Sequence, residues 1–66
     1  GMTEYEIVRK YVAIENIFDD EFDCTVAVRD NGFIVYNKDY KALTIVQTID
    51  GLVGFLDGLR SIRNEA

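Results

Sequence analysis

The spacing of apolar residues predicts a helix near the start of the chain, over residues 3–18. Its apolar positions recur at intervals of three or four and fall on one helical stripe. They are Ile7, Tyr11, Ile14 and Phe18. Thr3 and Glu6 have the spacing of a capping box, in which each side chain accepts from the other's backbone N–H. We expect the acids at 19–21 to end the helix, because negative charge at a helix C-terminus opposes the helix dipole.

A change to two-residue alternation predicts a half-buried strand over residues 22–29. One face of this strand carries Phe22, Cys24, Val26 and Val28. Asp30-Asn31-Gly32 is typical of a hairpin turn, because Asn and Gly tolerate positive φ. Residues 33–36 form the expected return strand, and residues 37–39 form a second polar turn.

The stretch from residue 40 to residue 47 fits two structures. Its β-branched second half favours a third strand. Its apolar residues also keep a helical spacing with those that follow, so one long C-terminal helix from about residue 39 is an alternative. We favour the strand, because Thr48 or Asp50 is a good N-cap for a separate helix over residues 49–63.

These elements predict an α+β fold in one domain that covers residues 1–66. The order is α-β-β-β-α, with both helices on one face of a three-stranded antiparallel sheet. If the long helix forms instead, the order is α-β-β-α. Gly1, which precedes Met2, is interpreted as a residue left by tag removal.

Composition excludes several classes of function. The chain has no histidine and a single cysteine, so we expect no metal site, no cofactor and no catalytic centre. A lone thiol fits a reducing compartment, and we expect a cytoplasmic protein. The net charge is −5, and residues 1–33 hold eight acids against three bases. Such a chain is repelled by phosphate backbones and anionic membranes, so we expect neither nucleic-acid nor membrane binding.

The predicted element order resembles that of the double-stranded-RNA-binding domain. That resemblance implies basic residues at the start of the second helix, where such domains hold phosphates. This chain has Ile49-Asp50-Gly51 at that position and Asp57 one to two turns later. The resemblance is therefore one of topology, and RNA binding is not expected.

Two surfaces favour self-association, as a homodimer or higher oligomer. If both helices cover one face of the sheet, the other face carries Ile34, Tyr36 and Leu43, and an apolar face needs a cover. Gly51, Gly54 and Gly58 fall on one side of the last helix and form a smooth stripe that another backbone could approach. We therefore interpret the chain as a small, non-enzymatic protein-interaction module.

The acidic residues suggest an alternative function, in which the chain is an adaptor or inhibitor that docks a basic protein surface or imitates a nucleic acid. The docking residues would be Glu15, Asp19, Asp20, Glu21 and Asp23. Glu15 lies where two apolar faces of the first helix meet, so its side chain should reach solvent or a tyrosine hydroxyl. Cys24 is interpreted as a core residue rather than a nucleophile.

Overall fold

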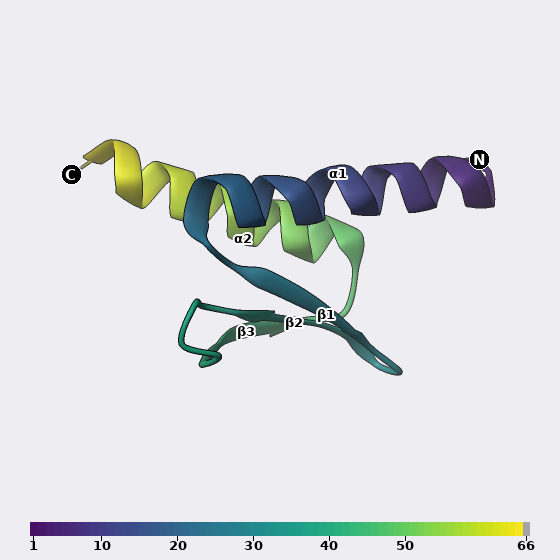
Figure 1. The fold of residues 1–66 in the computed structure, drawn as a ribbon. Helices are drawn as coiled ribbons and strands as arrows, with labels where there is room; N and C mark the ends of the chain where they lie inside the picture. The colour runs from purple at the N-terminus through teal and green to yellow at the C-terminus, as the bar shows by residue number, and fades with distance from the viewer. Residues whose placement is uncertain (66) are drawn as a thin grey trace.

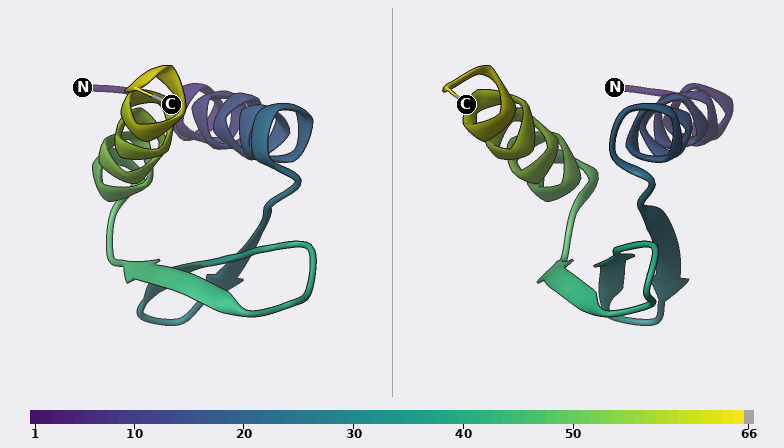
Figure 2. Two further views of the ribbon diagram at one scale, coloured as in Figure 1. Left: turned by 90° about the vertical axis from the view of Figure 1, so that its left-hand side faces the viewer. Right: turned by 60° about the vertical axis from the view of Figure 1, so that its left-hand side comes forward.

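A computed structural model describes residues 1–65 and shows two layers, with two helices on one face of a three-stranded sheet (Figure 1). The elements are α1 (Glu4–Phe22), β1 (Thr25–Arg29), β2 (Gly32–Tyr36), β3 (Ala42–Val46) and α2 (Ile49–Glu65). Helix α1 packs on β1 and helix α2 packs on β3 (Figure 2). The predicted α+β fold and its element order are confirmed.

The sheet has the order β1-β2-β3, so β2 is central and the other two strands are edges. The register between β1 and β2 is unbroken from Thr25–Tyr36 to Arg29–Gly32. Between β2 and β3 the register shifts, because Leu43 is an extra residue on β3 and makes a β-bulge.

The predicted hairpin turn lies between β1 and β2, and its glycine is required by close packing. Gly32 has φ +143, and a Cβ atom built on it would collide with the carbonyl oxygen of Val46. A substitution at this position therefore has to move the neighbouring strand as well as strain the backbone.

The core lies between the two layers and is small. Its buried side chains come from both helices, from the two strands β1 and β2, and from the segment before β1. They are Ile14, Phe18, Cys24, Val26, Val35, Leu52 and Leu56. Cys24 is only 3% exposed, as expected for a core residue.

Helix α1 ends four residues later than predicted, and Phe22 lies in it rather than in the first strand. The acids of the last turn do not end the helix, because Arg60 and Arg63 of α2 neutralise Glu21. The helix ends instead at Asp23, which has φ 52 and ψ 37 and acts as a left-handed C-cap. The capping box between Thr3 and Glu6 at its start is confirmed.

Strand β3 replaces the alternative of a long C-terminal helix, although it is shorter than the predicted residues 40–47. Tyr40 stands outside it with φ 60, in a turn whose backbone N–H groups bond to Asn37. Thr48 caps α2, since its hydroxyl accepts from the N–H of Gly51. No helix within residues 1–65 is long and apolar enough to cross a membrane.

Candidate interaction surface

The outer face of the sheet is the face turned away from both helices, and its side chains follow from the strand register. Side chains of paired residues in neighbouring strands point to the same face. Val26 and Val35 are paired and buried under the helices, so the alternate residues point outward. The outward residues include Ala27 on β1, Ile34 and Tyr36 on β2, and Ala42 and Ile45 on β3.

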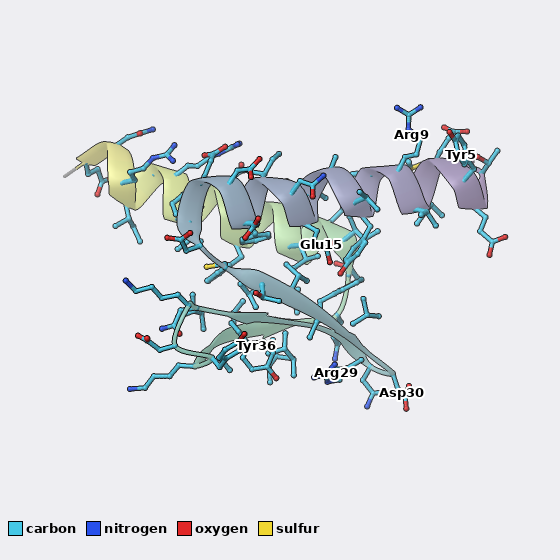
Figure 3. All side chains as sticks on the ribbon, in the orientation of Figure 1. Tyr5, Arg9, Glu15, Arg29, Asp30 and Tyr36 are labelled. Atoms are coloured by element: carbon cyan, nitrogen blue, oxygen red, sulfur yellow. The ribbon has the colours of Figure 1, made fainter. Side chains whose placement is uncertain are left out.

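The outer face is largely apolar and partly open to solvent. Ile45 is 69% exposed, and Leu43, which opposes Tyr36 together with Ala42 at the bulge, is 43% exposed. The structure thus brings together the three predicted residues Ile34, Tyr36 and Leu43. Figure 3 shows Tyr36 on this side of the sheet and Arg29 and Asp30 at its hairpin end.

The described chain exposes more surface than a compact monomer of its size. Its accessible area is 4812 Å², whereas a compact protein of this mass exposes about 4250 Å². Among residues 1–65, seven apolar side chains are buried and ten large ones are exposed, so the fold leaves much of its apolar surface uncovered.

The net charge is divided unevenly between the two layers. Helix α1 holds six acids and two bases, and helix α2 holds three acids and two bases, so the helix layer carries the whole net charge of −5. The strands and their connections hold three acids and three bases. The apolar outer face therefore belongs to a layer with no net charge.

The three glycines of α2 do not share one environment. Gly51 is partly buried and packs against β3, where a Cβ atom would lie 2.9 Å from Cβ of Val46. Gly54 and Gly58 are exposed, and within residues 1–65 nothing approaches a Cβ built on either of them within 4 Å. Only the last two are accessible to another chain, and they lie on the helix layer rather than on the sheet.

Two of the five predicted docking acids are engaged inside the chain. Glu21 accepts from Nε of Arg60 and Nη1 of Arg63, both at 3.0 Å, and these bonds lower the pKa of Glu21 to about 2. Glu15 accepts from the hydroxyl of Tyr11 at 3.0 Å, which is one of the two alternatives that the sequence left open. The first contact joins α1 to α2, and the second joins two side chains within α1.

The remaining docking acids are exposed. Asp19 and Asp20 lie in the last turns of α1, and Asp23 is its C-cap. Asp19 and Glu15 line a shallow hollow of about 230 Å³ together with Asn16, Cys24 and Thr25. Within residues 1–65 no group of three or more potential ligands is placed to hold a metal ion.

The thiol of Cys24 is unsuited to nucleophilic chemistry. Burial, and to a lesser degree the charge of Asp23, raises the pKa of Cys24. Its sulfur donates to the carbonyl oxygen of Phe22 at 3.5 Å. A protonated, covered thiol is a poor nucleophile.

Comparison with known protein families, with curated proteins and with solved structures finds no match to this chain.

Proposed function

We propose that this chain is a small, non-catalytic protein-interaction module that associates with a further copy of itself through the outer face of its sheet. The observation that carries the proposal is the exposure of an apolar sheet face opposite the helices, with Ile45 at 69% and Leu43 at 43%. Burying such a face removes apolar area from water, which is the main driving force of association. A cytoplasmic location fits the single buried thiol of Cys24.

The distribution of charge supports a second copy as the partner. Two copies that meet through their outer faces bring together layers with no net charge and keep the acidic helix layers on the outside. Packed sheets lie about 10 Å apart, and each helix layer lies about 10 Å beyond its sheet, so the acidic layers are roughly 30 Å apart. Repulsion over that distance is screened at ordinary ionic strength.

The size of the face indicates a weak interface. Three strands about 4.8 Å apart and roughly 17 Å long give a footprint of about 240 Å². A stable interface of standard size buries about 800 Å² on each partner. We therefore expect association through this face alone to be weak and reversible.

Replacing Ile45 with Asp tests the proposal. A carboxylate in the middle of the face has to be desolvated on association, so the variant should lose the contact through the outer face and form smaller assemblies than the wild-type chain. Sedimentation equilibrium of both proteins measures this. Ile62→Asp is the matched control, because Ile62 is similarly exposed but lies near the end of α2.

The proposal fails if the wild-type chain stays monomeric throughout, or if Ile45→Asp associates as the wild type does. Circular dichroism of each variant checks that it is folded.

Docking of a basic protein through Asp19, Asp20 and Asp23 is the alternative function. It is the less favoured of the two, because Glu15 and Glu21 already have partners within the chain.

A further inference from the structure

We infer that the open edge of β1 is a second contact between copies, where β1 pairs antiparallel with β1 of another chain around a two-fold axis at Ala27. This inference rests on the proposed self-association and specifies an interface that the outer face does not provide.

The two edges of the sheet differ in how well they resist pairing. An edge strand is protected from other chains by bulges and by lysine residues. Strand β3 contains the bulge at Leu43 and is preceded by Lys41. Strand β1 is in unbroken register over all five of its residues, and its only charged residue is Arg29 at the end. The β1 edge is therefore the one suited to receive another strand.

The hydrogen-bonding groups at this edge follow from the ladder. Arg29 and Gly32 close a two-residue loop, so they form a hydrogen-bonded pair, and such pairs recur at every second residue. Ala27 accordingly directs its N–H and C=O toward β2. Val26 and Val28 direct theirs toward the open edge.

The sequence of β1 is compatible with pairing to itself. With Ala27 opposite Ala27 of the other copy, Val26 lies opposite Val28. These two residues have the groups needed for a hydrogen-bonded pair once Arg29, whose Nη1 donates to the Val28 carbonyl at 3.0 Å in the single chain, shares or releases that oxygen. Their side chains meet on the face that carries the helices, where Val28 is 59% exposed in the single chain. On the outer face Arg29 lies opposite Thr25, so like charges do not face each other.

Helix α1 also presents apolar side chains toward this edge. Val8 and Val12 are 54% and 44% exposed. Lys10 marks the side of α1 that faces α2, because its ammonium is 3.7 Å from Asp50. Val8 and Val12 lie about 160° around the helix from Lys10, so they are on the flank away from α2. Glu15 on the same flank lines a hollow with Thr25, which places that flank beside β1.

The two-fold pairing brings the α1 flanks of the two copies toward each other. It covers Val28 at the edge and shields Val8 and Val12 on the flank. It also joins two outer faces into one six-stranded platform with a footprint of about 480 Å², twice that of the single chain. Edge pairing thus enlarges the surface through which the proposed function operates.

Amide hydrogen exchange measured by NMR at low and high protein concentration tests the inference. In the single chain the amides of Val26 and Val28 have no partner in β2, and in the pair they donate across the interface. We expect these two amides to become protected as concentration rises, while the amide of Ala27 is protected at every concentration.

Three variants separate this interface from the outer face. Val28→Lys places an ammonium in the pair and should abolish both the edge dimer and the protection of Val26. Ile45→Asp should leave that dimer and its protection intact, and Ile62→Lys is the control for introducing a lysine.

If the wild-type chain associates while Val26 and Val28 exchange at one rate at all concentrations, the edge inference is overturned and the outer-face proposal stands. If Ile45→Asp abolishes the protection of Val26, the edge does not associate by itself and the inference is also overturned. If the edge dimer survives in Ile45→Asp and the wild type forms nothing larger, the outer-face proposal fails and the edge inference stands. A wild-type chain that is monomeric throughout overturns both.

Discussion

The side chain of Tyr11 extends from α1 toward the sheet, where it makes two contacts that together fix its ring. The ring stacks on Phe33 with centroids 5.5 Å apart, and the hydroxyl donates to Glu15 at 3.0 Å. Partial burial raises the pKa of Tyr11 to about 12, and the hydrogen bond and the negative charge of Glu15 act in the same direction. The ordinary value for tyrosine is about 10.

This shift predicts a loss of stability at high pH. The folded chain holds the Tyr11 proton more tightly than the unfolded chain. Protonated Tyr11 therefore stabilises the fold fully below pH 10, and this stabilisation is lost as pH rises toward 12. The free energy of unfolding, measured by denaturation at each pH in this range, should decline as pH rises, and the decline should be smaller in Tyr11→Phe. Near-ultraviolet titration should show a tyrosine transition near pH 12 that is absent in Tyr11→Phe, and a titration that is the same at that pH in both proteins would contradict the assignment.

At the scale of the element, local pattern predicted the starts of both helices because their caps are local. Thr3 with Glu6, and Thr48 with Gly51, bond within three residues along the chain. The end of α1 could not be predicted in this way. The charges that allow the helix to continue through Glu21 come from Arg60 and Arg63, which are 39 and 42 residues away.

The choice between a third strand and a long helix was also settled by contacts distant in sequence. Residues from Ala42 onward keep a helical spacing, but Ile45 pairs with Ile34 and Val46 pairs with Phe33 in the sheet. The bulge at Leu43 has no sequence signal of its own. The strand starts at Ala42 rather than at Tyr40 for a different reason, because Tyr40 has φ 60 and lies in the turn at Asn37.

The exposed glycines of α2 give a prediction for that helix. Gly54 is exposed in a helix interior, where alanine is more favourable by about 1 kcal/mol, so Gly54→Ala should stabilise the chain by about that amount. Urea denaturation measures the change. Gly54→Leu should fold equally well, and its effect on sedimentation distinguishes a helix surface that contacts another chain from one that faces solvent. No stabilisation by alanine would show that the site is not an open helix surface.

At the scale of the whole molecule, alternation along the strands was enough to predict the outer face. Residues two apart share a face, so Ile34 and Tyr36 had to lie together once the helices covered the opposite side. The exposure of Val28 was not predicted, since alternation places it under the helices with Val26. Alternation identifies which side chains share a face of the sheet. It does not show which strand lies at the edge, or how far a helix covers that strand.

The charge of the helix layer predicts how association responds to salt. Edge pairing brings together two α1 helices that each carry a net charge of −4, so screening of their repulsion should strengthen association as salt is raised. Docking of a basic protein on the same acids should instead become weaker as salt is raised, because salt screens the attraction. Light scattering over a salt series measures the difference, and self-association that weakens with salt would contradict the proposed interfaces.

The elongated outline of the molecule has a consequence for how the chain can be joined to other proteins. The described chain measures 38 × 23 × 17 Å, and its two ends lie at opposite ends of the long axis, both in the helix layer (Figure 1). A fluorescent protein fused at either end is attached away from the outer face of the sheet. A circular permutant, by contrast, needs a connecting segment of at least about 12 residues to span that length.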